Sequence, residues 1–311
     1  MDKTAPFDRA AQVLPTGLRS AALALPEEVR SRAEELRLRL GQPVTVLAAG
    51  TELEVPGPPP VDREALDAVL EIATQASAHT ALERVRRGYV ALRGGHRVGL
   101  CGMAAMEGGQ IKSLRCLSSL NLRVARSVTG AAAEVLPPLR RGGGVFSALI
   151  LAPPGAGKTT LLRDLVRALS DGEAGEPLRV SVADERGEIA ALWEGKPELD
   201  VGKHTDVMDG CPKALGLELL LRGMNPQVLA ADELTSPDDL GAAELAAGCG
   251  VPLLATAHGG GRQDLLRRPL YRELLALGIF QKLVTIRRGP DGERETAVED
   301  IEVVFPEEER T

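Results

Sequence analysis

The first part of the sequence combines two strand-like patterns with one helical pattern. Apolar and charged residues alternate over residues 36–40 (LRLRL), a turn sequence occupies residues 41–43, and valines alternate again over residues 44–46. This pattern predicts a β-hairpin. Residues 63–76 predict a helix, and two further strand-like runs flank residues 94–95, a Gly-Gly pair that tolerates the positive φ of a tight turn. We therefore expect a mixed α/β domain here.

The second part of the sequence alternates apolar strands with helices, which predicts a largely parallel sheet covered on both faces. Four short apolar runs are typical of buried strands: VFSALILA, RVSVAD, QVLAADE and VPLLATAH. Leucines and valines recur on one helical face over residues 159–169. Ser236 and Pro237 predict the start of another helix, with Ser236 as its N-cap. Residues 200–214 follow neither hydrophobic period and predict a loop, and a C-terminal hairpin is expected about residues 289–292.

A proline- and glycine-rich stretch at residues 136–144 (LPPLRRGGG) predicts the hinge between the two parts. The length of 311 residues agrees with about two domains. We therefore expect a smaller N-terminal α/β domain over residues 1–140 and a second α/β domain over residues 141–311.

Composition and charge argue against a dedicated nucleic-acid binder. Hydrophobic residues make up 44% and charged residues 26%, which is ordinary for a globular protein. The net charge is -7, with 18 Lys and Arg against 15 Asp and Glu over residues 1–140, and 19 against 29 over residues 141–311. An acidic total and few aromatic residues do not favour a DNA-binding or base-stacking surface. The exception is residues 84–126, with nine Lys or Arg and one acid, which form either a solvated face or a surface for phosphate or an acidic partner.

Targeting and cysteine signals are weak. The N-terminus lacks the apolar core of a signal peptide, and no apolar run approaches the ~18 residues of a spanning helix, so we expect a cytosolic protein. The cysteines have no metal-binding or disulfide-framework spacing, and we expect reduced packing residues at Cys101, Cys116, Cys211 and Cys249.

The run LILAPPGAGKTT, residues 149–160, predicts a phosphate-binding loop between a strand and a helix. Backbone N–H groups at a helix start bind phosphate, Lys158 would reach the β and γ oxygens, and the Thr159 hydroxyl would ligate Mg²⁺. The predicted site for a nucleoside triphosphate and Mg²⁺ consists of Pro154, Gly155, Ala156, Gly157, Lys158, Thr159 and Thr160. Ala152 replaces the first glycine of the signature, which the loop tolerates if the φ angle of this alanine is negative.

A second motif, QVLAADEL, places two adjacent carboxylates after a buried strand. Asp232 would hold Mg²⁺, and Glu233 would polarise the attacking water. The alternative interpretation is a structural cap at the end of the strand.

Two further strand ends give weaker signals. The run VSVADERGEI ends a strand in Asp184 and Glu185, with Glu188 three residues later, but Glu185 and Arg186 would alternatively form an ordinary surface pair. The run LLATAHGGG places His258 at the carboxyl end of a strand, the edge at which α/β sheets bind ligands. His258 is therefore either a structural histidine or a sensor of the γ-phosphate.

The sequence resembles the stage III sporulation protein AA family, relatives of the secretion-system ATPases, in five consecutive motifs: APPGAGKTTLLRDL, VADERGEIAAL, HTDVMDGCPKA, LLRGMNPQVLAADEL and ATAHG. Three N-terminal runs are similar to the same family: LRLRLGQPV, GGHRVGLCG and SSLNLRVAR. The resemblance therefore extends over nearly the whole chain. It implies a RecA-like P-loop core with a smaller mixed α/β N-terminal domain.

The resemblance also implies a function. It indicates an ATP-hydrolysing motor that assembles as a homo-oligomeric ring, a hexamer, at the cytoplasmic face of the mother-cell membrane. The motor would energise a secretion-like channel to the forespore, with membrane-embedded channel proteins of the sporulation complex as partners. No nucleic acid is expected, and the preference for ATP over GTP follows from the family alone.

Individual residues take roles from the same resemblance. Glu185 and Glu188 match an acidic box that helps to activate water in secretion ATPases, and they compete with Glu233 for the role of base. The sequence ADE departs from the glycine-glutamate usual in these motors and makes Glu233 our first choice. His258 matches a histidine box, and Arg222 matches an arginine that precedes the second acidic strand.

A ring would also allow arginines of one N-terminal domain to act on a neighbour's nucleotide. The candidates for such a role in trans are Arg93, Arg97, Arg115 and Arg123. Two other functions remain open at this point. The first is a nucleotide-gated, weakly hydrolysing structural subunit, and the second is a nucleic-acid translocase that uses the basic residues 84–126.

Overall fold

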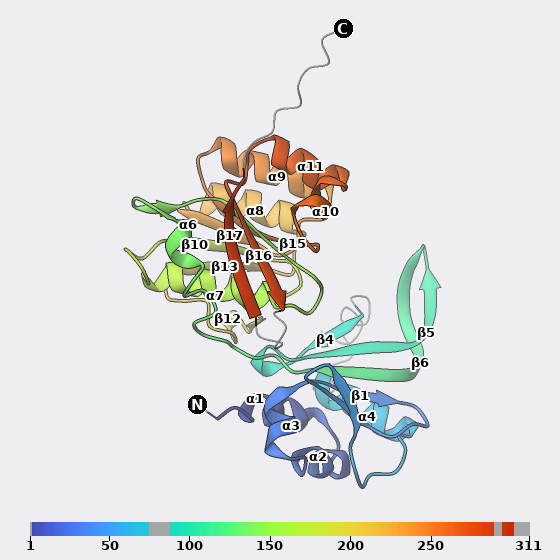
Figure 1. Cartoon of the computed structure of the whole chain (residues 1–311). Coiled ribbons are helices and arrows are strands. Elements are labelled where there is room, and N and C mark those ends of the chain that lie inside the picture. The colour runs from blue at the N-terminus through green and yellow to red at the C-terminus, as the bar shows by residue number, and fades with distance from the viewer. Residues whose placement is uncertain (1, 75–87, 289–293, 302–311) are drawn as a thin grey trace. The chain divides into compact units, whose positions relative to one another are not determined.

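The computed structural model describes residues 2–74, 88–288 and 294–301, and the chain divides into two compact units, Met1–Arg126 and Ser127–Thr311 (Figure 1). The division lies upstream of the hinge predicted at residues 136–144. Part of that stretch is a short helix, α6 (Leu136–Leu139), whose two prolines lie in its first turn and whose leucines are buried in the core of the second unit. The compact units therefore differ from the expected domains, residues 1–140 and 141–311, because the linker and α6 pack with the second unit.

The N-terminal unit is built on a six-stranded antiparallel sheet with strand order β3-β2-β1-β6-β5-β4. Its strands are β1 (Ala33–Arg39), β2 (Thr45–Ala48), β3 (Thr51–Glu54), β4 (Tyr89–Ala91), β5 (Arg97–Glu107) and β6 (Gln110–Arg123). Its helices are α1 (Ala5–Ala10), α2 (Thr16–Leu23), α3 (Glu27–Arg32) and α4 (Arg63–Thr74). The predicted hairpin (β1–β2), helix (α4) and strand pair about residues 94–95 (β4–β5) are confirmed.

The core of this unit follows from the alternation noted in the sequence. Leu36 and Leu38 of β1 are fully buried, and Phe7 of α1 packs in the same cluster. Strands β5 and β6 form a long ribbon that curves in Figure 1. The pairing is irregular at Gly102, where a side-chain Cβ would lie 2.1 Å from the carbonyl oxygen of Cys116. A glycine is therefore required at this bend.

The second unit is built on a seven-stranded sheet with order β13-β10-β14-β15-β9-β16-β17, parallel except for the edge strand β17. Its strands are β9 (Ala148–Ala152), β10 (Val180–Asp184), β13 (Thr205–Asp209), β14 (Val228–Ala231), β15 (Leu253–His258), β16 (Lys282–Arg288) and β17 (Arg294–Asp300). Its longer helices are α7 (Lys158–Asp171), α8 (Lys213–Gly223), α9 (Pro237–Gly248) and α11 (Pro269–Ala276), with a short α10 (Arg262–Leu266). Two small ribbons complete the unit: β7 (Arg140–Arg141) with β8 (Gly144–Val145), and β11 (Leu192–Trp193) with β12 (Lys196–Pro197).

Helices cover both faces of this sheet, as the apolar runs predict. Ile150 of β9 joins the hydrophobic cluster that includes Leu162 of α7, whereas its neighbours Leu149 and Leu151 join the cluster that includes Leu217 of α8. A strand buried on both faces has no polar alternation, which is why these strands appear as continuous apolar runs. In the parts of the chain that the structure describes, no helix combines the length and the apolar character needed to cross a membrane.

Several local predictions can be compared with the structure. The loop expected at residues 200–214 is wrong in part, because Thr205–Asp209 forms the edge strand β13, whose residues are half-buried or exposed and therefore lack a clear period. The N-cap at Ser236 is confirmed: its side chain accepts from the backbone N–H of Asp239 at 3.2 Å. The C-terminal hairpin is confirmed as β16–β17, while its turn at residues 289–292 lies outside the described residues.

Two other expectations need comment. Cys101 and Cys249 are exposed, so the prediction that they are packing residues is wrong, and all four cysteines are free thiols. In the basic region over residues 84–126, residues 84–87 lie outside the described part of the chain, as does Ala76 at the predicted helix end.

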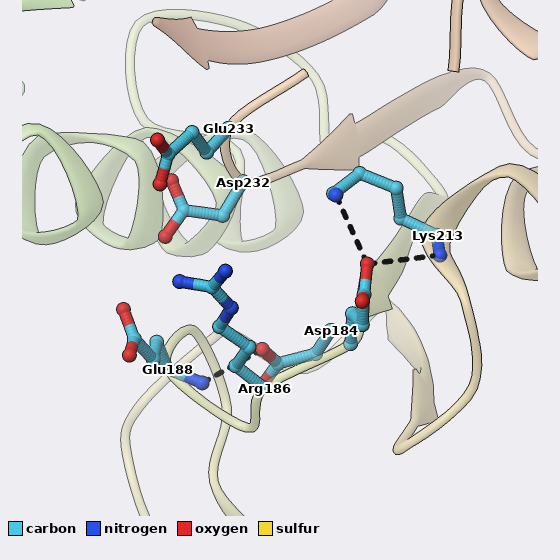
Figure 2. Close-up of a pocket in the computed structure, with 7 residues that line it drawn as sticks. Asp184, Arg186, Glu188, Lys213, Asp232 and Glu233 are labelled. Atoms are coloured by element: carbon cyan, nitrogen blue, oxygen red, sulfur yellow. Dashed lines mark hydrogen bonds and ion pairs between the residues drawn. The ribbon is translucent and has the colours of Figure 1, made fainter. Parts of the chain in front are cut away.

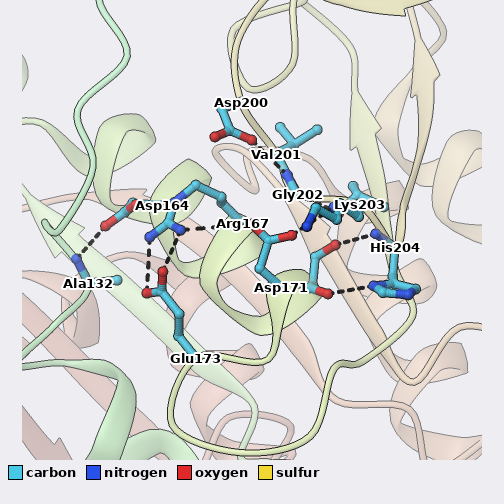
Figure 3. Close-up of polar contacts among 12 residues, drawn as sticks. Ala132, Asp164, Arg167, Asp171, Glu173, Asp200, Val201, Gly202, Lys203 and His204 are labelled. Carbon is cyan, nitrogen blue, oxygen red and sulfur yellow. Dashed lines mark hydrogen bonds and ion pairs between the residues drawn. The ribbon is translucent and has the colours of Figure 1, made fainter. Parts of the chain in front are cut away.

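Buried polar contacts hold α7 in place (Figure 3). Arg167, 7% exposed, donates to Asp164 at 2.7 Å, and Asp164 also accepts from the backbone N–H of Ala132 at 2.8 Å. Near the end of the helix, Ser170 Oγ accepts from the backbone N–H of His204 at 2.6 Å. These contacts tie the helix to the preceding linker and to the segment before β13.

Candidate functional site

The candidate site lies where four parallel strands end. Strands β9, β10, β14 and β15 are neighbours in the sheet and run in the same direction, so their carboxyl ends meet at one edge. This edge collects the loop after Ala152, the acids at Asp184, the pair Asp232 and Glu233, and His258. Each of these segments was predicted separately as a strand end, and the topology brings them together.

The predicted phosphate loop connects β9 to α7. Gly155 and Gly157 have φ angles of +73° and +93°, a conformation that disfavours residues with a Cβ. The helix starts at Lys158, directly after Gly157, so the first backbone N–H groups of α7 point toward the loop. Ala152 is the last residue of β9 and pairs with His258 in extended conformation. The condition under which Ala152 is tolerated, a negative φ, is therefore met.

Threonine hydroxyls and a buried carboxylate meet beside this loop. Thr159 Oγ1 donates to Asp232 Oδ2 at 2.8 Å, and Thr256 donates to the other carboxylate oxygen. Burial raises the pKa of Asp232, although the hydrogen bonds from Thr256 and Thr159 act in the opposite direction. The Thr159 hydroxyl and the Asp232 carboxylate are hard oxygen donors of the kind that Mg²⁺ prefers.

A chain of polar contacts runs from Lys158 through His258 to Glu233. Lys158 Nζ lies 2.7 Å from His258 Nδ1, and His258 Nε2 lies 2.9 Å from Glu233 Oε1. If the lysine donates to Nδ1, the imidazole must carry its proton on Nε2, which then donates to the glutamate. Lys158 is 6% exposed, and burial lowers its pKa while the carboxylates of Asp232 and Glu233 oppose this effect.

The main chain at Glu233 departs from an extended strand. Its φ is +40°, in the left-handed region that residues with a Cβ rarely adopt. The backbone N–H of Glu233 donates to Thr256 Oγ1 at 2.9 Å, so the same hydroxyl binds both members of the acid pair. Backbone strain of this kind is common at functional sites, because surrounding contacts must hold it.

Asp184 shapes the loop that carries Glu188. The Asp184 carboxylate is 1% exposed and accepts hydrogen bonds from the four successive backbone N–H groups of residues 188–191, including that of Glu188 at 2.7 Å. An acid with this many backbone donors is held in place as a structural anchor. All three predicted acids at this strand end line the pocket, and Asp184 differs from Glu185 and Glu188 in being buried and held by the backbone of the loop.

The pocket at this edge also contains two cations that the sequence analysis did not assign to the site, Arg186 and Lys213 (Figure 2). Glu185 pairs with Lys213 at 2.9 Å. Figure 2 shows the Arg186 guanidinium directed toward Asp232 and Glu188. Lys213 begins α8 inside the run HTDVMDGCPKA, which the sequence predicts to be a loop, so no local signal marks this lysine.

Arg222 is not brought to this pocket. It lies in the last turn of α8, its side chain is 71% exposed, and it pairs with Glu218 at 3.4 Å. Of the loop residues, Pro154 and Gly155 are exposed, while Thr160 is half-buried in the first turn of α7. The structure therefore brings the phosphate loop, Asp232, Glu233 and His258 to one edge of the sheet, together with Glu185 and Glu188. Arg222 lies outside this group.

Comparison with known proteins identifies close relatives. A family described as "Sporulation stage III, protein AA" matches residues 8–300. The stage III sporulation protein AA of Bacillus subtilis (strain 168) is 37% identical over 279 residues, which cover 89% of this chain and 90% of that protein. The match therefore includes both units.

Solved structures share the fold. The ATPase DotB from Legionella pneumophila superposes with a TM-score of 0.57 at 17% identity, covering 89% of this chain and 78% of that one. The pilus retraction motor PilT, solved with bound ADP, gives a TM-score of 0.58 at 17% identity and covers 86% of this chain and 78% of that one. The chain thus shares its fold, an N-terminal antiparallel sheet followed by a mostly parallel sheet with a RecA-like arrangement, with DotB and PilT.

Proposed function

Because the chain belongs to the stage III sporulation protein AA family, we propose that it is a Mg²⁺-dependent ATPase that works as a ring-shaped motor in sporulation. Its hydrolysis would energise a secretion-like channel between mother cell and forespore. The proposal places the protein at the cytoplasmic face of the mother-cell membrane, held there by membrane-embedded channel proteins. The fold shared with DotB and PilT supports the ATPase part of this proposal.

The contact between Thr159 and Asp232 carries the proposal. A hydroxyl at the start of α7 and a carboxylate after β14 converge at 2.8 Å beside a loop whose glycines leave its backbone open to phosphate. Thr159 and Asp232 would hold Mg²⁺, and the chain thus offers the oxygen donors that this ion requires. When bound, Mg²⁺ would neutralise charge on the β and γ oxygens of ATP. Lys158 would add a second positive charge at the same oxygens.

Glu233 is the base that the geometry supports best. Its carboxylate is anchored by His258 at 2.9 Å, and its side chain is 28% exposed, so a water molecule can reach it. Glu185 is held by Lys213 and is a weaker candidate. Glu188 lines the same pocket and is our second choice.

Ring assembly would complete the site with an arginine from a neighbouring subunit. Two of the four candidates are occupied within their own unit: Arg97 lies over the ring of Tyr89 at 4.9 Å, and Arg123 pairs with Glu35 at 3.7 Å. Arg115 is exposed on β6 and is therefore our first candidate for the role in trans, followed by Arg93. The proposed assembly is a homohexamer.

Steady-state phosphate release with Mg-ATP tests the proposal. The measurement compares wild type with Lys158→Ala, Glu233→Gln and Glu185→Gln over a range of protein concentrations. We expect turnover that rises faster than linearly with concentration, and a loss of about 100-fold or more in the first two variants. Glu185→Gln is the matched control, because it removes the same charge from the same pocket and should retain most of the activity.

Two outcomes would redirect the assignment. Tight ATP binding without turnover would indicate a nucleotide-gated structural subunit, since the loop would then bind without hydrolysis. Salt-sensitive stimulation by single-stranded DNA would indicate a translocase and would give the basic residues 84–126 a role in binding the phosphate backbone.

A further inference from the structure

An arginine from the C-terminal hairpin packs on the phosphate loop. If Gly157 carried a Cβ, that atom would lie 1.9 Å from Arg294 Nη2 and 2.7 Å from Arg294 Cζ. The guanidinium therefore lies directly against the glycine that precedes Lys158. The φ of +93° is what favours a glycine at position 157, since the Arg294 guanidinium is the end of a flexible side chain and could move aside.

The sheet topology explains this contact between distant parts of the sequence. Strand β16 runs parallel beside β9 as far as the pair Thr285–Leu151, so its remaining residues reach the loop that follows β9. Arg294, the first residue of β17, pairs with Arg288 at that end of the hairpin (Figure 1). Side chains two residues apart share a face of a strand, and Val298 of β17 packs on the same cluster as α7. Arg294 therefore lies on the face where α7 begins.

Arg294 adds a positive charge at a place that already favours anions. The N-terminus of a helix carries partial positive charge and attracts phosphate. Lys158, which is 6% exposed, already lies at this helix start. A phosphate chain would offset all three positive contributions, and a guanidinium can bind phosphate oxygens with two parallel hydrogen bonds.

We propose that Arg294 is a phosphate-binding residue, contributed in cis by the C-terminal hairpin to the nucleoside di- or triphosphate in the loop. This inference rests on the proposed nucleotide site and adds to it a residue 136 positions beyond Lys158 in sequence. The inference makes the hairpin β16–β17 part of the nucleotide site. A bound nucleotide would then contact the hairpin through Arg294 and hold it in position.

Equilibrium binding to the full chain tests the inference. The ligands are ATP, ADP and inorganic tripolyphosphate, which carries the phosphate chain without a base. The proteins are wild type, Arg294→Ala, Arg294→Lys and the control Arg272→Ala, which removes an exposed arginine from α11. We expect Arg294→Ala to lower the binding affinity for ATP, ADP and tripolyphosphate by about tenfold or more, a factor typical of a lost charge-assisted hydrogen bond. Arg294→Lys should recover part of the affinity, and Arg272→Ala should bind as wild type does.

The alternatives give different results. Wild-type affinity in Arg294→Ala would overturn the inference and leave the ATPase proposal intact. A loss of affinity for ATP but not for tripolyphosphate would also overturn it, because Arg294 would then act on the nucleoside. Equal losses in the alanine and lysine variants, together with a lowered unfolding temperature in both, would show a structural role and overturn it as well. A wild-type chain that binds no nucleotide would overturn the ATPase proposal itself.

Discussion

Lys158 and His258, separated by 100 positions in the sequence, lie 2.7 Å apart through Nζ and Nδ1. The lysine belongs to the phosphate loop, and the histidine ends the neighbouring strand β15. Through its other nitrogen, His258 also contacts Glu233 at 2.9 Å. The residue proposed to bind phosphate and the residue proposed to activate water are therefore joined by one imidazole ring.

Replacement of His258 should reduce turnover more than nucleotide binding. In His258→Ala, Glu233 loses the donor that orients its carboxylate, and we expect kcat to fall by about tenfold or more while ATP affinity stays within a few-fold of wild type. Phosphate release and equilibrium binding measure the two effects. His204→Ala is the control, because this histidine contacts the carbonyl of Ser170 at the end of α7 opposite to the phosphate loop. Unchanged kcat in His258→Ala would show that the imidazole has no part in orienting the base.

Replacement of Ala152 by the glycine of the phosphate-loop signature should not increase the proposed ATP turnover. Ala152 is 1% exposed in β9, so Ala152→Gly removes a buried Cβ and loosens a strand, and it should cost about 1 kcal/mol in the free energy of unfolding. Turnover should stay within about twofold of wild type, since the extended backbone at Ala152 needs no glycine. Urea unfolding and phosphate release check both expectations. Ala148→Gly, equally buried at the start of the same strand, should destabilise similarly; a marked gain in turnover with Ala152→Gly alone would contradict this account.

The buried ion pair of α7 should be important for stability. Asp164 is 1% exposed and binds both Arg167 and the Ala132 N–H, so Asp164→Asn should cost about 2–3 kcal/mol in the free energy of unfolding. Glu173, whose side chain is 52% exposed, also pairs with Arg167 at 2.6 Å. The control Glu173→Gln should cost less than about 1 kcal/mol because the site is solvated. Equal losses in the two variants would contradict the role assigned to burial.

The N-terminal unit should lose stability as the pH falls from about 6.5 toward 4. Burial, with smaller contributions from Arg9 and Arg126, lowers the pKa of His96 from its ordinary 6.5 to about 4. Between these values the unfolded chain binds a proton that the folded chain does not, so stability is full above 6.5 and decreases below it, by about 3 kcal/mol at most. Urea unfolding at several pH values measures this slope.

The variant His96→Gln isolates the contribution of the histidine. A glutamine amide oxygen can accept from the backbone N–H of Ala125, which donates to His96 Nδ1 at 3.0 Å, but it does not titrate. The carboxylates contribute equally to the pH dependence of the free energy of unfolding in wild type and in the variant over this pH range. The variant should therefore show a shallower pH dependence than wild type, and parallel slopes would contradict the lowered pKa.

Much of the fold could be predicted because the strands of the second unit are buried on both faces. The runs that became β9, β10, β14 and β15 are continuous and apolar, and the acids and the histidine that follow them mark one edge of the sheet. Strand β13 was missed because its residues are only half-buried. Helix α6 was missed because Pro137 and Pro138, together with the glycines that follow, are typical of a linker, whereas Leu136 and Leu139 are buried.

The contacts within the site could be predicted only in part. The order of motifs placed Lys158, Asp232 and His258 near one another, but the direction of each side chain depends on packing that no periodicity records. Lys213 and Arg294 were missed for the same reason. The neighbouring sequence of a lysine at a helix start, or of an arginine in an edge strand, does not distinguish it from an ordinary surface residue. Their positions follow from the pairing of strands that are distant in sequence.

The left-handed residue after β14 has a consequence for any attempt to move this acid pair to another protein. Consecutive side chains of an extended strand point to opposite faces of the sheet, so two adjacent acids in a regular strand could not both serve one pocket. Here the turn at Glu233, held by the Thr256 hydroxyl, lets Asp232 and Glu233 share it. A graft that copied only the two carboxylates would direct one of them to the opposite face of the sheet. The transferable unit is the pair, the bend in the main chain and the threonine of the adjacent strand.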